Sequence, residues 1–267
     1  MLHAPPGADP DRMRIEFLEQ GPATLVVNRE RTLVVADLHF GIESDLARHG
    51  WHFSSRSLER LHRVTDLVDR FRPDRLLLLG DVKQSVPFTT RQEWRELPEV
   101  LAAFRARAPL LVVPGNHDPG IERLLRPEEL AERTGVVVDG VGYLHGHTLP
   151  APCLAGLLVL VGHHHPLAAI QDEVGCAVRT PAYLVGELDG PCLGLPPAGR
   201  PTRVLFTPAF NELAGYDVQR IVTAPFSPVS RCLKRETVEV LLADGTLLGP
   251  IEALAPPDRG GGEVSAG

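Results

Sequence analysis

Three short apolar runs in the first half of the chain are separated by two helical patterns, and this alternation constrains the fold most strongly. The runs are Thr32–Ala36, Leu76–Gly80 and Leu110–Pro114. Their continuous apolar character is typical of strands that are covered on both faces. Strands that alternate with helices of this length pair in parallel through right-handed crossovers. The first half therefore predicts a parallel sheet with helices packed on it.

The two helical patterns have clear limits in the sequence. In the first, apolar residues recur every three or four positions over residues 58–71, and Pro73 ends the pattern. The second covers residues 94–104. It follows a Thr90-x-x-Glu93 sequence, which predicts a capping box at the start of the helix.

The second half of the chain is rich in strand patterns and has little helical periodicity. The segments that predict strands are GVVVDG, GYLHG, GLLVLVG, CAVRT, AYLVGEL and TRVLFT. Residues 190–201 are rich in Gly and Pro and predict a surface loop. Residues 1–13 and 256–267 predict flexible tails, because they contain too few apolar residues to order themselves. We therefore expect a single domain over residues 14–255.

Composition argues against several classes of protein. There are 27 lysines and arginines against 34 aspartates and glutamates, a net charge of −7, which disfavours tight unspecific binding to DNA. No apolar run approaches the about 20 residues of a membrane helix, and the first residues lack the apolar segment of a signal peptide. Four scattered cysteines without a CxxC pair argue against a disulfide framework and a thiolate zinc site; they are Cys153, Cys176, Cys192 and Cys232. A reducing cytoplasm is the expected location.

Five short polar motifs each follow directly on one of the apolar runs. In chain order they are Asp37-Leu38-His39, Gly80-Asp81, Gly115-Asn116-His117-Asp118, His145-Gly146-His147 and Gly162-His163-His164-His165. Loops at the carboxyl ends of strands in an open α/β sheet meet in one crevice, so we expect the motifs to share a site. In the first and last motifs, the spacing of two residues would put the outer side chains on the same side of an extended backbone.

The ligand set that we draw from these motifs has two aspartates, one asparagine and four histidines, and it contains no thiolate. Such nitrogen and oxygen donors suit manganese, iron or zinc, and we favour manganese. About seven ligands are too many for one ion, so we predict two ions about 3.5–4 Å apart that share a carboxylate. Asp81 is the candidate bridge, because it is the lone carboxylate of its motif. Any one of these motifs alone is more often an ordinary turn or surface feature.

The ordered set of motifs, spanning residues 37–165, resembles the calcineurin-like metallophosphoesterase superfamily. Residues 162–170 (GHHHPLAAI) and 207–215 (TPAFNELAG) are similar to a prokaryotic branch that includes the DNA ligase-associated phosphoesterases and archaeal relatives. Asn211 in the second segment could turn towards the metal centre, but a turn-forming role is expected. The resemblance implies an α/β fold, a four-layer αββα sandwich of two mixed sheets flanked by helices.

The resemblance also implies a role for each residue of the motifs. One ion would be held by Asp37, His39, Asp81 and His165, and the other by Asp81, Asn116, His145 and His163, with His147 as the alternative to His145. His117 would lie beside the substrate, as general acid or as a phosphate contact, while a water bridging the two cations is activated as the nucleophile. Many relatives carry GDxxD, in which the later Asp orients the catalytic His. Here Gln84 stands at that position, and Asp118 is the candidate replacement.

We therefore expect a metal-dependent hydrolase of phosphodiesters or phosphomonoesters, with diesters slightly preferred. Nucleotides or nucleic acid are the candidate substrates, no association with a membrane is expected, and nothing in the sequence identifies a protein partner. The alternative is an inactive member of the fold that serves as a scaffold for a protein partner. The complete set of ligand positions argues against that alternative.

Overall fold

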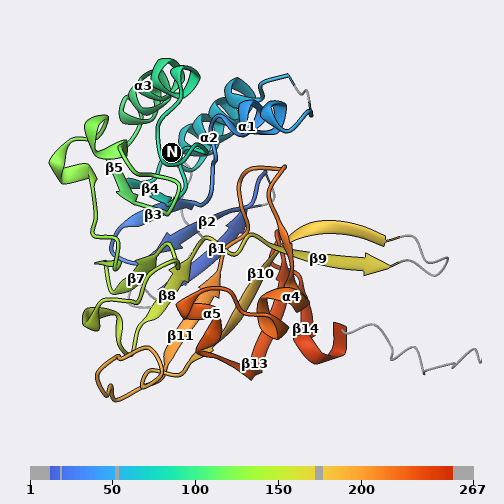
Figure 1. Cartoon of the computed structure of the whole chain (residues 1–267). Helices are drawn as coiled ribbons and strands as arrows, with labels where there is room; N and C mark the ends of the chain where they lie inside the picture. Colours follow the sequence, from blue (N-terminus) through green and yellow to red (C-terminus); the bar gives the residue numbers. More distant parts are fainter. Residues whose placement is uncertain (1–12, 19, 52–53, 172–176, 255–267) are drawn as a thin grey trace, which may run out of the picture.

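The computed structural model describes residues 13–254 except residues 19, 52–53 and 172–176. Within these residues, two mixed β-sheets stack face to face and helices cover the outer face of each sheet (Figure 1). This is the αββα sandwich expected from the sequence. Apart from Met13, both expected tails lie outside the described residues, so the division into one domain and two tails stays a prediction.

The first sheet has the strand order β1-β2-β3-β4-β5. Its strands are β1 (Arg14–Leu18), β2 (Ala23–Val27), β3 (Arg31–Val35), β4 (Arg75–Leu79) and β5 (Leu110–Val113). The predicted parallel pairing is confirmed for β3 with β4 and for β4 with β5. Strands β1 and β2 were not expected from the sequence. They extend the sheet because β2 pairs antiparallel with β3 and β1 pairs antiparallel with β2.

Helices α1 (Ile42–Arg48), α2 (Ser57–Phe71) and α3 (Arg91–Arg105) cover the outer face of this sheet (Figure 1). Both predicted helices are present as α2 and α3. The predicted capping box begins α3: the Thr90 hydroxyl accepts from the Glu93 amide, and the Glu93 carboxylate accepts from the Thr90 amide. This helix continues through Pro98, which lies inside it.

The second sheet has the order β12-β9-β10-β11-β8-β7-β6, and β13 and β14 add to it beyond β10. Its strands are β6 (Val136–Val138), β7 (Val141–Leu144), β8 (Leu158–Val161), β9 (Pro166–Gln171), β10 (Ala177–Leu188), β11 (Thr202–Phe206), β12 (Tyr216–Asp217), β13 (Leu233–Leu242) and β14 (Leu247–Pro250). Two segments expected as separate strands, CAVRT and AYLVGEL, form the single strand β10, apart from Cys176, which is not described. The first part of β10 pairs with β9, and the second part pairs with β11 and β13.

Short helices cover the outer face of the second sheet and connect its strands. They are α4 (Val218–Thr223) and α5 (Pro228–Arg231), with 3-10 turns elsewhere at Ile121–Arg123, Pro127–Glu129, Pro152–Leu154 and Ile251–Leu254. In the described part of the chain, no helix has both the length and the apolar character needed to cross a bilayer.

Three apolar cores hold the layers together, and the alternation of side chains along the strands supplies them. In β4, Leu76 and Leu78 pack towards α2 and α3, whereas Leu77 and Leu79 pack between the two sheets. A third core, which includes Phe206, lies between the second sheet and its helices. Burial of apolar surface contributes about 25 cal/mol per Å², so both faces of each sheet contribute to stability.

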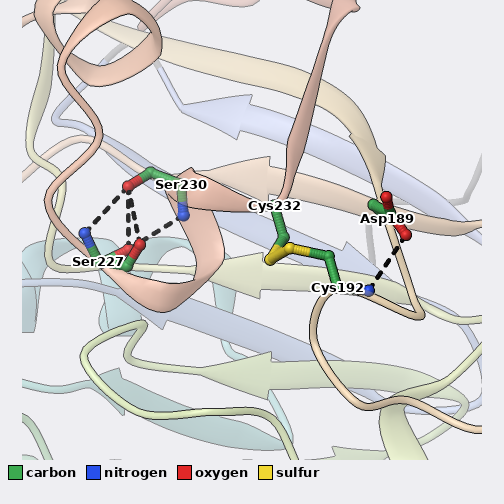
Figure 2. Close-up of a disulfide and its surroundings, with 5 residues drawn as sticks. All are labelled: Asp189, Cys192, Ser227, Ser230 and Cys232. Carbon is green, nitrogen blue, oxygen red and sulfur yellow. Dashed lines mark hydrogen bonds between the residues drawn. A yellow bond between two sulfur atoms is a disulfide. The ribbon is translucent and has the colours of Figure 1, made fainter.

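The scattered cysteines argued against a disulfide framework, but Cys192 and Cys232 form a disulfide (Figure 2). The two cysteines are 40 positions apart, so no local spacing indicates the pair. Antiparallel pairing of β10 with β13 places Leu188 opposite Leu233. This register brings the chain that follows β10 next to the chain that precedes β13. The disulfide removes the cysteine-based reason for expecting a reducing compartment, and the cytoplasmic location stays a prediction.

Cys192→Ser should lower the free energy of unfolding by about 2–4 kcal/mol, because the disulfide restricts the unfolded chain. Urea unfolding of the oxidised proteins measures this difference. The matched control is Cys153→Ser, which removes an exposed free thiol and should stay within about 0.5 kcal/mol of the unsubstituted protein. Equal stability of the two variants would contradict the disulfide.

Candidate metal centre

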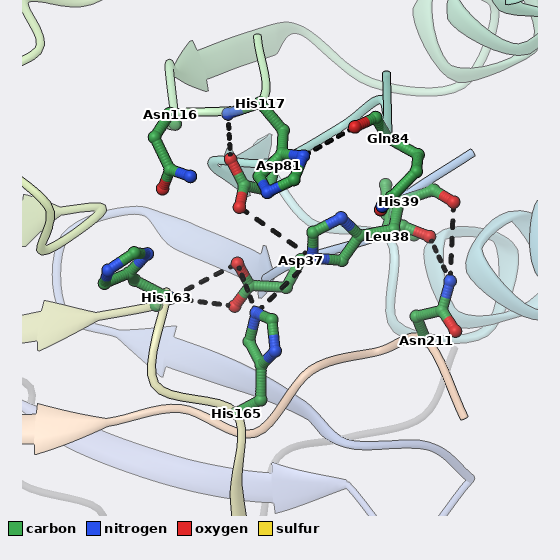
Figure 3. A network of polar contacts seen from close by, with 12 residues as sticks. Asp37, Leu38, His39, Asp81, Gln84, Asn116, His117, His163, His165 and Asn211 are labelled. Atoms are coloured by element: carbon green, nitrogen blue, oxygen red, sulfur yellow. Dashed lines mark hydrogen bonds and ion pairs between the residues drawn. The ribbon is translucent and has the colours of Figure 1, made fainter. Parts of the chain in front are cut away.

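The five polar motifs lie together at one edge of the two sheets, at the carboxyl ends of β3, β4, β5, β7 and β8. Figure 3 labels side chains of the first, second, third and fifth motifs, which point towards one another. Main-chain hydrogen bonds join two of the loops beyond their strands. The Asp37 amide donates to the Gly80 carbonyl at 3.1 Å, and the His39 amide donates to the Asp81 carbonyl at 2.8 Å. Motifs from distant parts of the chain are therefore held side by side by their own backbone.

The backbone at the motifs is not extended, contrary to the sequence-based expectation. Asp37, His39, Asp81, His163 and His165 have positive φ angles from 43° to 68°. This left-handed region costs a non-glycine residue about 1–3 kcal/mol and persists only where the surroundings enforce it. The side chains therefore converge because the loops turn tightly, and the alternation of a strand is not involved.

One group of four side chains surrounds a common point. Their potential ligand atoms all lie within 4.8 Å of one another, and the group consists of Asp37, His39, Asp81 and His165. The Nε2 atoms of His39 and His165 face each other at 3.4 Å, and Nε2 of His165 lies 3.2 Å from Oδ1 of Asp37. Burial and the nearby His165 lower the pKa of His39 to about 3, against the opposing effect of the carboxylates. A neutral ring in this position offers a lone pair to a cation.

A second group shares Asp81 with the first. Potential ligand atoms of Asp81, His145 and His163 also lie within 4.8 Å of one another. Oδ1 of Asn116 lies 3.2 Å from Nε2 of His145, which brings the amide oxygen to the same group. Nδ1 of His145 lies 3.2 Å from the Leu79 carbonyl oxygen, so it carries the hydrogen and Nε2 is turned towards the group. Metal-binding histidines commonly have this arrangement.

His147, the alternative to His145, does not contribute an atom to either group. Its ring lies 5.2 Å from the His145 ring and 6.2 Å from the His163 ring. Within the described residues, its buried Nδ1 atom has no hydrogen-bond partner. The structure thus brings together every residue predicted as a ligand, with His145 in the position that faces Asp81.

Electrostatics in the two groups are dominated by the pair of buried carboxylates. Burial acts to raise the pKa values of Asp37 and Asp81, but the surrounding histidines outweigh it and hold both below their usual range. Burial acts to lower the pKa of His145, but Asp81 and Asp37 more than offset it and raise this pKa to about 9. At neutral pH, both ring nitrogens of His145 are therefore protonated in the metal-free protein, and the ring is positively charged. Burial and the nearby His145 lower the pKa of His163 to about 4, so that ring is neutral.

Glycines within the motifs make room for side chains from other motifs. A β carbon on Gly80 would lie 2.0 Å from Nδ1 of His145, and one on Gly115 would lie 2.1 Å from Oδ1 of Asp81. Such distances are shorter than any real contact of a β carbon. Any larger residue at these two positions would collide with a side chain of another motif, so glycine is required. The spacing of residues in the sequence does not reveal this contact.

His117 lies at the edge of the first group and is oriented by main-chain contacts. Its amide donates to Oδ1 of Asp81 at 2.8 Å. Its Nδ1 lies 2.5 Å from the carbonyl oxygen of Gln84 and donates to it. Gln84 stands where many relatives have the orienting Asp, so its carbonyl takes the place of the missing carboxylate. Nε2 of His117 makes no hydrogen bond with the described residues.

Asp118, the candidate replacement for that carboxylate, contacts main chain instead. It is fully buried, and its two oxygens accept from the Gly115 amide at 2.8 Å and the Lys83 amide at 3.2 Å. Burial and the nearby Asp81 raise the pKa of Asp118 to about 6. These contacts join the loops that follow β4 and β5. A catalytic role for Asp118 stays a prediction.

Asn211 contacts the main chain of the first motif, in addition to forming the expected turn. Its Nδ2 donates to the Leu38 carbonyl at 2.9 Å and lies 3.4 Å from the His39 carbonyl (Figure 3). Its main-chain amide donates to the Asp37 carbonyl at 3.3 Å. The expected turn is also present, because Oδ1 accepts from the Leu213 amide at 2.8 Å. Asn211 thus fastens the left-handed loop that carries two candidate ligands.

A cleft of about 350 Å³ opens beside the first group, a volume within the usual range of small-molecule sites. Its lining residues are His39, Ile42, Gln84, His117, His165, Leu213, Ala214, Gly215 and Tyr216. The Tyr216 ring stacks on the His165 ring, with centroids 6.0 Å apart. Among the described residues, no lysine or arginine lines this cleft.

Solved structures resemble this chain in fold. The Pseudomonas putida nuclease MPE matches it with a TM-score of 0.51 and 16% sequence identity, covering 87% of this chain and 98% of the nuclease. Yfce, a phosphoesterase from E. coli, gives a TM-score of 0.34 and 20% identity, covering 53% of this chain and 73% of Yfce. A search of curated proteins found no sequence that matches.

The sequence itself matches the family of calcineurin-like phosphoesterases over residues 30–174. This match covers more than half of the 267 residues and includes all five polar motifs. The chain therefore belongs to the calcineurin-like phosphoesterase family.

Proposed function

We propose that this protein hydrolyses phosphoesters with the help of two divalent metal ions, and that it prefers phosphodiesters. The observation that carries the proposal is Asp81, whose carboxylate belongs to both groups of converging ligand atoms. Manganese is the proposed metal, with iron or zinc as alternatives, because the donors are nitrogen and oxygen without thiolate. When bound, the two ions would activate a water molecule and neutralise phosphoryl oxygens.

The protein would hold each ion with one of the two groups. Asp37, His39, Asp81 and His165 would bind the first ion, and Asp81, Asn116, His145 and His163 the second. Three features of the structure support this assignment. Potential ligand atoms converge in two groups, the carboxylates stay ionised, and two of the imidazoles are neutral. A cation at each point would satisfy atoms that otherwise repel one another.

His117 is the proposed general acid. Its Nδ1 donates to the Gln84 carbonyl, so Nε2 is the nitrogen that can give a proton to the leaving oxygen as the ester bond breaks. The ring also lines the cleft beside His39 and His165. The Gln84 contact keeps the ring in this orientation without an additional carboxylate.

The charge of the cleft supports a preference for diesters. A phosphodiester carries one negative charge, whereas a phosphomonoester carries up to two. The described lining of the cleft offers no lysine or arginine to balance the second charge. Nucleotides or nucleic acid are the proposed substrates, which agrees with the resemblance in fold to a nuclease and with an aromatic ring, Tyr216, in the lining.

Asp81→Asn should lower the turnover of bis-p-nitrophenyl phosphate with Mn²⁺ by more than about 100-fold, because losing a shared ligand costs more than losing an outer contact. Metal analysis after dialysis should show fewer than two ions bound per chain. Asp66→Asn, an exposed carboxylate on α2, is the matched control and should behave like the unsubstituted protein. Full activity of Asp81→Asn would refute the bridge. Neither metal nor turnover in the unsubstituted protein would favour the scaffold alternative.

His117→Ala should keep both metal ions and lose about 10²–10⁴-fold in kcat, the usual contribution of a general acid. The loss should be greatest for diesters with an alkoxide leaving group and smallest for p-nitrophenolate, which leaves without a proton. Steady-state kinetics on both kinds of diester, together with metal analysis, test this. A variant that loses metal would show that His117 is a ligand instead.

Metal binding should release a proton from His145 at pH 7.5, because the raised pKa of about 9 keeps the ring charged until an ion displaces the proton. The apparent affinity for Mn²⁺ should therefore rise with pH and level off above about pH 9. Calorimetry in buffers of different ionisation enthalpy measures the released protons. His145→Gln should release about one proton fewer, and equal release by both proteins would contradict the assignment.

A further inference from the structure

His164 stands between two proposed ligands, His163 and His165, yet its side chain is directed away from the metal centre. The ring is fully buried. It packs edge-on against Phe206, with centroids 4.6 Å apart, and lies 5.1 Å from the ring of Phe226. This side chain therefore anchors the ligand-bearing loop in the core between the second sheet and its helices.

Both nitrogens of the His164 ring have a partner. Nδ1 lies 2.8 Å from the Gly162 carbonyl oxygen, which can only accept, so Nδ1 carries a hydrogen. Nε2 lies 2.7 Å from the Ser227 hydroxyl. Among the described residues, no carboxylate contacts the ring, which is therefore neutral and accepts the Ser227 hydrogen at Nε2. The Ser227 hydroxyl and the Gly162 carbonyl thus fix the orientation of the buried ring from its two nitrogens.

Ser227 is itself fixed at the start of α5. Its hydroxyl accepts from the main-chain amide of Ser230 at 3.1 Å, and its own main-chain amide donates to the Ser230 hydroxyl at 3.1 Å. Cys232 follows at the other end of the helix and is linked to Cys192 (Figure 2). The atom that holds His164 therefore belongs to a short helix that is secured at both ends.

The loop that carries His163 and His165 needs such support. Both residues have positive φ angles, 68° and 43°, and strained backbone of this kind relaxes unless its neighbours prevent it. We propose that Ser227 is a positioning residue, which acts through His164 to keep His163 and His165 in the conformation that binds metal. This inference rests on the proposed function of the two groups as a metal centre.

The test compares Ser227→Ala with Ser230→Ala in the full chain. Ser230→Ala removes hydrogen bonds of the same helix cap but leaves the contact between Ser227 and His164. Calorimetric titration with Mn²⁺ should show affinity that is about 10-fold weaker or more for Ser227→Ala, the effect typical of losing an outer partner of metal ligands. Ser230→Ala should stay within about threefold of the unsubstituted protein, because no contact to His164 is lost.

A spectroscopic measurement separates positioning from general loss of structure. With saturating Co²⁺, the visible absorption spectrum reports the geometry of the ligands, and it should change in Ser227→Ala but not in Ser230→Ala. Ser227→Gly gives a second test, because glycine is tolerated at a helix start and also lacks the hydroxyl. It should weaken metal binding as Ser227→Ala does.

Unchanged affinity and an unchanged spectrum in Ser227→Ala would overturn the inference while leaving the metal centre in place. Equal weakening in Ser230→Ala would overturn it as well, since the cap as a whole would then be responsible. If the unsubstituted protein binds neither Mn²⁺ nor Co²⁺, the proposed function and this inference fail together.

Discussion

Two buried carboxylates and four imidazoles, three of them buried and His163 half-buried, lie around adjacent points, and the rest of this structure depends on this constraint. Groups of this kind are costly to remove from water unless a partner of opposite charge balances them. Hydrogen bonds inside the cluster leave Nδ1 of His39 buried without a partner among the described residues. The proposed metal ions would balance these groups, and the strained loops and close-fitting glycines hold the candidate ligands in place.

The fold supplies the site by placing two sheets so that their strand ends meet. Loops after β3, β4 and β5 come from the first sheet, and loops after β7 and β8 come from the second. Apolar cores on both faces of each sheet keep these strands rigid. The loops are then braced by residues far along the chain, Asn211 on the first motif and Ser227 on the last. Residues beyond the last proposed ligand, His165, therefore support the candidate metal centre.

Features set by local patterns could be predicted from the sequence, whereas features set by distant contacts could not. The apolar runs, the helix that begins at Thr90 and the five motifs were all visible locally, and the ligand atoms of the motifs do come together. The link between Cys192 and Cys232 depends on the register of β10 and β13, which spacing does not reveal. The Gln84 carbonyl orients His117 through main chain, so no residue type signals it. The backbone at His163 and His165 is left-handed and not extended, so the expected alternation of side chains along a strand is absent. The two side chains nevertheless point towards the same site.

Anomalous diffraction from crystals grown with Mn²⁺ would test the central claim most directly, because it locates the ions without reference to activity. The account predicts two peaks about 3.5–4 Å apart, one on each side of the Asp81 carboxylate and both in contact with it. A single peak, or none, at Asp81 in a correctly folded crystal would contradict a dinuclear centre in this protein.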